Sequence, residues 1–283
     1  MKILTFDIEE WFHIEMNPKF NVESKWNSYE RRLDQNMDLV FELLEKHDQK
    51  ATFFCLGWIA REYPHIIKRI DDLGHEIGSH SDMHKIAYTL NRKEYSDDLE
   101  RSIASLEEAI GKKIISYRAP AFSIKSENSW ALDQLIEQGI KIDSSIFPAK
   151  RDFGGFDEFS IDEPCIIESL SGELMEFPMN THSLFGQRFV FSGGGYFRFF
   201  PKWSLKKMMN SSEYIMGYFH PRDFDPDIPL IKELSIMRKF KSYYGLKSTY
   251  EKLDYFLENE KFIDLGTAVK MIDWSKSQRI SIS

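Results

Sequence analysis

The first 145 residues alternate short apolar runs with segments of helical periodicity, and this alternation restricts the fold more than any other feature. Five runs, "KILTF", "ATFFCL", "HEIGSHS", "IISYRAP" and "IKIDSS", are typical of buried strands. Between them lie amphipathic segments, such as residues 30–47 and the segment that Gly111 ends. Strands that alternate with helices of this length imply a parallel sheet built from right-handed crossovers. We therefore expect an α/β fold, and favour a closed barrel over an open sheet.

After Phe147 the alternation loosens. Residues 148–202 contain "FGGF" and "SGGGYFRFFP" and few helical signals, so we expect an elaborated loop region with one strand at "LMEFPM". A strand at "YIMGYFH" and a helix over about residues 242–260 then restore the pattern. The sequence has no repeat, low-complexity tract or linker, which favours a single domain over residues 1–283.

Composition narrows the function classes. A chain of 283 residues can bury a sizeable core, and its formal net charge of −8 argues against general attraction to nucleic acid or to anionic membranes. No apolar run reaches the roughly 18 to 20 residues of a membrane span, and the N-terminus has no signal-peptide pattern. We expect a cytoplasmic chain with two core thiols, Cys55 and Cys165, no integral membrane segment and no nucleic-acid partner. Its oligomeric state is open.

Charged and imidazole side chains follow the expected strands. In a parallel barrel, residues just past the C-terminal strand ends converge on one face, where such folds do chemistry. The alternative, that each residue only solvates its own turn, has to be invoked separately for at least five strands. The residues in question are Asp7, Glu9, His80, His84, Arg118, Asp143 and His220.

Two of these residues have the spacing of metal ligands. His80 and His84 lie four apart in "HSDMH", a spacing at which a turn or helix brings both imidazoles to one side. Two surface histidines in a loop are the alternative. The motif predicts a metal site only together with a carboxylate.

Five motifs, in order, resemble the polysaccharide deacetylase family, also called carbohydrate esterase family four, with its NodB-type homology domain. They are "TFDIEE", "HSDMH", "RAPAF", "DSS" and "YFHP", and "SGGGYFRFFP" resembles a branch associated with exopolysaccharide and surface-glycan gene clusters. The resemblance implies a distorted (β/α) barrel of about seven parallel strands. It also implies a hydrolase of linear amides that removes an N-acetyl group from an amino sugar in a polysaccharide, surface glycan or glycan precursor.

The resemblance also implies roles. Asp7 would be the general base, His220 the general acid that protonates the leaving amine, and Arg118 the partner that keeps Asp7 ionised. Asp143 matches the fourth motif, with its role open. A divalent metal, zinc by default and otherwise Co²⁺, Ni²⁺ or Mn²⁺, would be held by the two histidines and a carboxylate, and would polarise the acetamide.

The carboxylate is where this sequence departs from the family. Two adjacent aspartates are usual, whereas Asp7 is followed by Ile8. Because strand side chains alternate, Asp7 and Glu9 share a face, so Glu9 is the expected ligand and Glu10 the second choice. The longer glutamate keeps a second hypothesis open, a metal-independent hydrolase of a small cyclic amide or ureide, as in allantoinase-like relatives. A catalytically silent glycan-binding protein is disfavoured, because base, acid, arginine and histidines are all present.

Aromatic residues suggest how a sugar would be held. In "GGGYFR", the side chains of Tyr196, Phe197 and Arg198 would contact the substrate. Arg198 would donate hydrogen bonds to the sugar or bind an anionic group of the substrate. The alternative is that the three side chains only hold the loop in place. Trp11 lies beside the expected site, and Phe122 would supply an apolar wall. The sequence leaves open which sugar and acyl group are used, and whether the substrate is polymeric, lipid-linked or nucleotide-linked.

Overall fold

The structure is a computed structural model that describes residues 1–13, 23–149, 151, 153–184, 187–232 and 234–282. Nine strands form one sheet in the order β10-β1-β2-β3-β4-β5-β7-β6-β11. The first seven in this order are parallel to their neighbours, whereas β6 is antiparallel to β7. Seven parallel strands confirm the expected α/β architecture. The strands are β1 (Lys2–Ile8), β2 (Thr52–Cys55), β3 (Glu76–Ser79), β4 (Ser116–Tyr117), β5 (Ile142–Asp143), β6 (Cys165–Ser169), β7 (Gly172–Glu176), β10 (Ile215–Phe219) and β11 (Arg279–Ser281).

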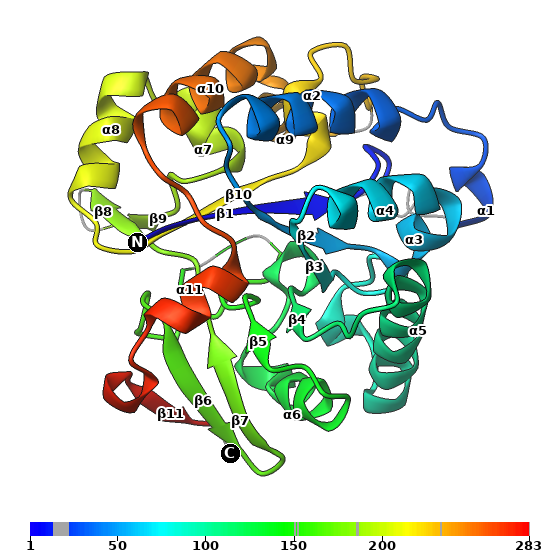
Figure 1. The fold of residues 1–283 in the computed structure, drawn as a ribbon, viewed down its shortest axis with the longest axis vertical. Helices are drawn as coiled ribbons and strands as arrows, with labels where there is room; N and C mark the ends of the chain where they lie inside the picture. The colour runs from blue at the N-terminus through cyan, green and yellow to red at the C-terminus, as the bar shows by residue number, and fades with distance from the viewer. Residues whose placement is uncertain (14–22, 150, 152, 185–186, 233, 283) are drawn as a thin grey trace.

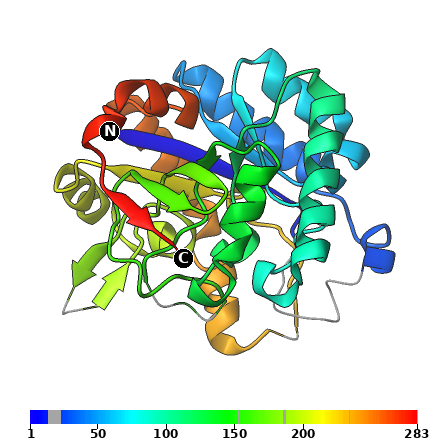
Figure 2. The same cartoon turned by 90° about the horizontal axis from the view of Figure 1, so that it is seen from below.

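Helices surround this sheet, as Figure 1 and the turned view in Figure 2 show. The longest, α5, begins with a capping box between Asn91 and Glu94 and ends at Gly111, whose φ of 67° suits glycine. The helices are α1 (Glu23–Trp26), α2 (Leu33–Lys46), α3 (Gly57–Glu62), α4 (Pro64–Asp72), α5 (Arg92–Ile110), α6 (Trp130–Glu137), α7 (Gly194–Phe199), α8 (Lys202–Asn210), α9 (Ile236–Tyr243), α10 (Thr249–Asn259) and α11 (Leu265–Met271).

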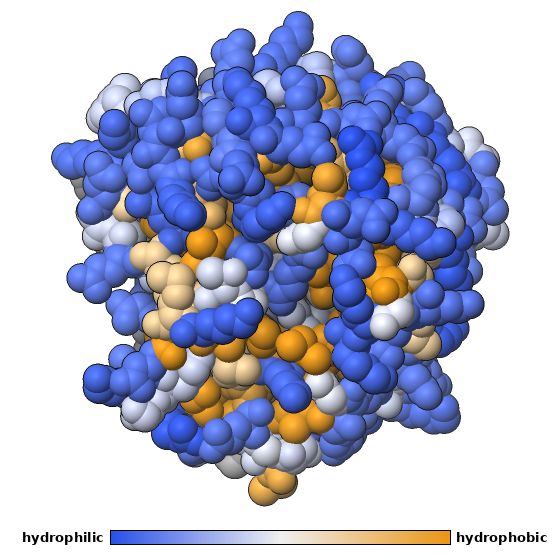
Figure 3. Space-filling model, in the orientation of Figure 1, coloured by the Kyte–Doolittle hydropathy of each residue, from blue (hydrophilic) through white to orange (hydrophobic). Residues whose placement is uncertain are grey.

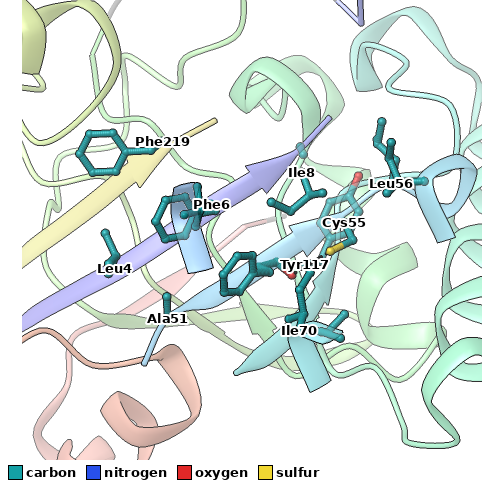
Figure 4. Close-up of a cluster of buried hydrophobic side chains, with 14 of the residues drawn as sticks. Leu4, Phe6, Ile8, Ala51, Cys55, Leu56, Ile70, Tyr117 and Phe219 are labelled. Carbon is teal, nitrogen blue, oxygen red and sulfur yellow. Dashed lines mark hydrogen bonds between the residues drawn. The ribbon is translucent and has the colours of Figure 1, made fainter. Parts of the chain in front are cut away.

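Strand β1 contributes side chains to two apolar clusters, one on each side of the strand. Leu4, Phe6 and Ile8 belong to the large apolar cluster drawn in Figure 4, which packs the sheet against the helices. Ile3 belongs to a second cluster on the other side of the strand. Because side chains alternate, Asp7 shares the side of Ile3, facing the interior of the barrel.

The face seen in Figure 3 is largely hydrophilic, with hydrophobic residues showing between the polar ones.

The sheet curls into a barrel, and contacts across it show the closure. Arg118, just after β4, donates hydrogen bonds to Thr5 and Asp7 of β1, three places away in the sheet. On the other side, the backbone N–H of Met216 in β10 donates to Asn180, which follows β7, and Gly193 forms an isolated bridge with Tyr218. The chain after β7 therefore closes the gap to β10.

Two expectations for the second half need correction. The region over residues 148–202 contains more than one strand: it holds β6 and β7, the two-stranded sheet of β8 (His182–Leu184) and β9 (Gln187–Phe189), and helix α7. The helix expected over about 242–260 is two helices, α9 and α10, separated at Gly245, which has a φ of 73°. Among the described residues, no helix combines the length and apolar character that a membrane crossing requires.

Candidate active site

A cavity of about 540 Å³ opens at the C-terminal ends of the parallel strands. Asp7 and Glu9 enter it from β1, His80 and His84 from the chain after β3, and His220 from the end of β10. The expected convergence of these five side chains is therefore present.

Asp7 is a buried carboxylate held by an arginine. Arg118 donates from Nη1 to Oδ1 of Asp7 at 2.9 Å and to the hydroxyl of Thr5 at 2.7 Å, and from Nη2 to the hydroxyl of Ser144 at 2.9 Å. Burial alone would raise the pKa of Asp7, but the positive charge of Arg118, together with His80 and His220, holds that pKa below its usual value. Asp7 is therefore ionised and fixed in position, as a general base requires.

Glu9 lies at the centre of a group of cationic and imidazole side chains. Nε2 of His84 is 2.8 Å from Oε2, while Nε2 of His220 and Nη1 of Arg222 lie 3.1 Å and 3.0 Å from Oε1. Burial raises the pKa of Glu9, but Arg222, His84 and His220 outweigh it and hold the pKa well below its usual value. Glu9 is thus an anion at the pH of the cell.

Glu10, the second choice for a metal carboxylate, points elsewhere. It accepts hydrogen bonds from the backbone N–H groups of Arg32 and Leu33, at the start of α2, and from the hydroxyl of Tyr63 at 2.6 Å. Glu10 does not line the cavity. The structure therefore favours Glu9 over Glu10.

His80 is presented as a neutral imidazole. Its Nδ1 lies 2.7 Å from the carbonyl oxygen of Arg118, which accepts the Nδ1 proton and leaves Nε2 with a lone pair. Burial lowers the pKa of His80 to about 4, although Asp7 raises it. The ring centroid lies 5.3 Å from that of His84. This tautomer and charge are those of a metal-binding histidine.

Glu9, His80 and His84 are side chains of the types that bind a divalent metal. Oε2 of Glu9 is buried, and Nε2 of His84 lies 2.8 Å from it. A buried carboxylate oxygen of this kind is stabilised by a cation, and one carboxylate with two imidazoles is a known zinc ligand set. The described residues contain no group of three His, Cys, Asp or Glu side chains arranged to hold an ion. The donors fit by type, and metal binding belongs to the proposal below.

His220 is held by a residue that the sequence analysis did not select. Oδ2 of Asp223 accepts a hydrogen bond from the backbone N–H of His220 at 2.9 Å and lies 3.3 Å from its Nδ1. This leaves Nε2 facing the cavity, 3.9 Å from Oδ2 of Asp7. Asp223 is in turn paired with Arg198. The signal was present in "HPRD", where the carboxylate lies one turn after the histidine.

Comparison with known proteins agrees with this geometry. Residues 19–138 match the polysaccharide deacetylase family, and residues 144–270 match a domain of unknown function, DUF3473. The segment over residues 19–138 is thus similar to polysaccharide deacetylases. His80, His84 and Arg118 lie in this segment, whereas His220 and much of the outer cavity wall come from the DUF3473 segment. One sheet contains strands from both segments.

Curated relatives show the same similarity, and a solved structure shows the same fold. A peptidoglycan-N-acetylglucosamine deacetylase of Bacillus cereus is 31% identical over 103 residues, which cover 36% of this chain and 38% of that protein. A peptidoglycan-N-acetylmuramic acid deacetylase of Bacillus subtilis is 33% identical over 88 residues, 31% of this chain and 34% of that protein. This chain thus spans little more than a third of these curated relatives. A Mycobacterium smegmatis crystal structure assigned to the polysaccharide deacetylases has a TM-score of 0.66 and 18% identity, covering 99% of this chain and 92% of that one, and it shows the fold.

Two of the five expected sugar contacts, Phe197 and Trp11, do not line the cavity. Phe197 is buried, with its ring centroid 4.9 Å from that of Phe219, so it belongs to the core. Arg198 is also buried and bonds to Asp223 and to backbone carbonyls, including that of Tyr244 at 2.9 Å. Trp11 does not line the cavity, and its indole N–H donates to the backbone of Glu30. Tyr196, Phe122 and, despite its burial, Arg198 do line the cavity.

Asp143, the other candidate, is not brought to the cavity. It lies opposite Glu176 in the β5–β7 pairing, and both side chains are fully buried. Burial raises the pKa of both carboxyl groups, for Glu176 well above its usual value, since two carboxylates this close do not both ionise. The pair is best described as sharing a proton inside the barrel wall. A catalytic assignment for Asp143 is therefore not supported by its position.

His13 borders the cavity but is held by aromatic packing. Its Nδ1 accepts a hydrogen bond from the backbone of Glu10 at 3.1 Å, and its ring lies 4.3 Å from Trp26 and 4.9 Å from Trp58 between centroids. These contacts indicate a structural side chain beside the candidate metal ligands.

The outer cavity wall has a charge that the sequence analysis missed. The described lining includes three carboxylates, Asp7, Glu9 and Asp223, and twice as many cationic side chains. The sequence has the opposite overall sign, −8. Aromatic residues, among them Phe122, Phe147 and Tyr218, line the same cavity. The cationic lining residues are Arg151, Arg188, Arg198, Arg222, Arg238 and Lys241.

Proposed function

We propose that this chain hydrolyses the N-acetyl group of an amino sugar in a glycan or glycan precursor, releasing acetate and a free amine. The observation that carries the proposal is that Nε2 of His220 lies 3.9 Å from Asp7 and 3.1 Å from Glu9. Arg118 keeps Asp7 ionised, and Asp223 orients His220. The deacetylases among the relatives support the reaction class.

Each side chain has a definite task in this proposal. Asp7 takes a proton from the attacking water, whose oxygen forms a bond to the acetamide carbon. His220 gives a proton from Nε2 to the leaving nitrogen as the carbon–nitrogen bond breaks. A divalent metal, zinc by default, would be held by Glu9, His80 and His84 and would polarise the carbonyl and acidify water when bound.

The charge of the outer wall extends the proposal to the substrate. Arg151 stacks on Phe122 and Phe147, with its guanidinium carbon 5.1 Å and 4.5 Å from their ring centroids. Its Nη1 is buried and makes no hydrogen bond to the described residues. Arg118 also lies over Phe122, with its guanidinium carbon 5.4 Å from the ring centroid. Arg151 and Arg118, the residue that holds Asp7, therefore contact the same ring. Arg151 would bind a phosphate or carboxylate near the acetylated sugar.

A second candidate is metal-independent hydrolysis of a small cyclic amide or ureide. The salt bridge between Arg222 and Glu9 favours it, since an arginine can neutralise this carboxylate without a metal ion. The test is a substrate panel with acetate release and bound metal measured on the same protein. Deacetylation of N-acetyl amino sugars that is lost on chelation and restored by zinc supports the first function. Full turnover of cyclic amides by metal-free protein supports the second.

A further inference from the structure

Helix α9 exposes an apolar face at the mouth of the cavity. None of its residues is buried, and Ile236 and Met237 are 88% and 63% exposed, while Phe240 and the following Tyr244 are 45% and 47% exposed. The spacing of Ile236, Phe240 and Tyr244 places them on one side of the helix. Soluble proteins seldom leave such an apolar face uncovered unless it binds something.

The face continues onto the neighbouring helix α7. Phe199 is 52% exposed, and its ring centroid lies 6.3 Å from that of Phe240 and 6.1 Å from that of Tyr244. Phe240 and Tyr244 stack with centroids 4.7 Å apart. We call this surface the α9 patch. It consists of Phe199, Ile236, Met237, Phe240 and Tyr244.

The polar side of α9 is basic. It carries Arg238, Lys239 and Lys241, and the helix has no acidic residue. Over residues 229–247 the sequence has five basic residues and one acidic residue, in a chain whose net charge is −8. A short helix with aromatic and aliphatic residues on one side and lysine and arginine on the other has the composition of a helix that lies in a membrane interface.

We propose that the α9 patch docks on the surface of an anionic lipid bilayer, with the helix lying along the interface. The charge pattern favours this partner over a second copy of the chain. A symmetric dimer would pair two copies of the same basic helix, with no acidic residue of α9 to offset the charge. Lipid headgroups of opposite charge attract these residues, while the patch enters the apolar layer. The net charge of the whole chain is negative, but the residues around α9 are mostly basic, so this part of the surface can bind an anionic membrane.

Docking would direct the cavity at the membrane. Met237, Phe240, Tyr244 and Phe199 line the cavity mouth as well as the exposed surface. An amino sugar joined to a lipid through a phosphate would then enter from the bilayer side and meet Arg151. This consequence rests on the proposed function, whereas the docking itself does not.

Co-sedimentation of the purified chain with vesicles tests the docking. We expect binding to vesicles of phosphatidylcholine and phosphatidylglycerol to be at least about tenfold stronger than to phosphatidylcholine alone, and to weaken at high salt. Ile236→Asp should lower the partition coefficient about tenfold or more, and Lys239→Glu about fivefold. Neither residue lines the cavity, and Ile236 is 88% exposed, so the thermal unfolding of Ile236→Asp should match that of the parent chain.

Leu170→Asp is the matched control. Leu170 is 97% exposed in the turn between β6 and β7, at the opposite end of the molecule from α9 in Figure 1. It should leave vesicle binding unchanged. Equal binding to both vesicle types, or an equal loss with Leu170→Asp, would overturn the proposal. A dimer in gel filtration that Ile236→Asp dissociates, without vesicle binding, would make the patch an interface between copies. Since no substrate is present, a failure of the deacetylase assay would not affect this result.

Discussion

Arg118 and Asp7 form a buried ion pair across the barrel, with Nη1 of Arg118 2.9 Å from Oδ1 of Asp7. Arg118 is itself fixed by Thr5 and by the backbone and hydroxyl of Ser144. The pair therefore sets both the charge of Asp7 and its direction towards the cavity. In the proposed deacetylation, Asp7 is the general base. Glu9, two residues later on the same face, is the carboxylate that would bind the metal.

This division of labour predicts different losses for the two acids. Asp7→Asn should lower kcat about 10²- to 10⁴-fold, the usual contribution of a general base, while the bound metal per chain stays constant. Glu9→Gln should lose the metal. Elemental analysis and acetate release measured on the same samples check both outcomes. Metal loss in Asp7→Asn with retention in Glu9→Gln would mean that the two roles are reversed.

The adjacent residues Phe197 and Tyr196 should differ in stability. Phe197 is 1% exposed and packs on Phe219 and Phe256, so Phe197→Ala should lower the free energy of unfolding by about 3–5 kcal/mol. Tyr196 is 49% exposed, so Tyr196→Ala should cost less than about 1 kcal/mol. Urea unfolding of both variants measures the difference. Equal losses of unfolding free energy in the two variants would show that Phe197 is not a core residue.

Arg151→Met tests the anionic substrate. One charge-assisted hydrogen bond is worth about 1.5–3 kcal/mol, so KM for an N-acetyl glycan with a neighbouring phosphate or uronate should rise roughly ten- to a hundredfold. KM for a neutral N-acetyl oligosaccharide should change little. Arg92→Met is the control, because Arg92 also lies over an aromatic ring, that of Trp130, but not at the cavity. An equal rise for both substrates would contradict a charge-specific contact.

The buried pair of Asp143 and Glu176 should make stability depend on pH. Burial raises the pKa of Glu176 in the folded chain, so the folded state keeps a proton that the unfolded state releases above about pH 4.3. The contribution of Glu176 to the free energy of unfolding is complete below about pH 4.3 and is lost as pH rises through the pKa of Glu176 in the folded chain. Glu176→Gln should remove this loss, which approaches about 1.4 kcal/mol per pH unit for one proton.

Urea unfolding between about pH 5 and pH 8 measures this effect. The free energy of unfolding of the parent chain should fall relative to that of Glu176→Gln as pH rises. Glu158→Gln, at an exposed carboxyl, should follow the parent chain. Parallel curves for the parent and Glu176→Gln would show that the pair holds no extra proton.

The fold was predictable because its signals are local and repeated. Alternation of strands and helices specifies a parallel sheet, and residues after strand ends, such as His80 and His220, then meet at one face. Alternation along β1 also separated Glu9 from Glu10, which instead bonds to the start of α2.

The rest depended on contacts between distant segments. Phe197 and Arg198 have the composition of a sugar-binding loop, but their burial against β10 and the backbone after α9 is set by packing that no local pattern records. Asp143 follows a strand like the other candidates, yet its pairing with Glu176 becomes visible only when β5 lies beside β7. The basic cavity wall likewise gathers residues from separate elements, among them β9, α7 and α9.

The proposed deacetylation is tested most directly by a time course of acetate and free amine in one reaction with an N-acetyl amino-sugar glycan and the zinc-loaded chain. We expect equal amounts of acetate and new amine, with both rates reduced about 10²- to 10⁴-fold in Asp7→Asn protein that keeps its metal. Zinc-loaded chain that releases neither product, or Asp7→Asn protein that works at the parent rate, would contradict it.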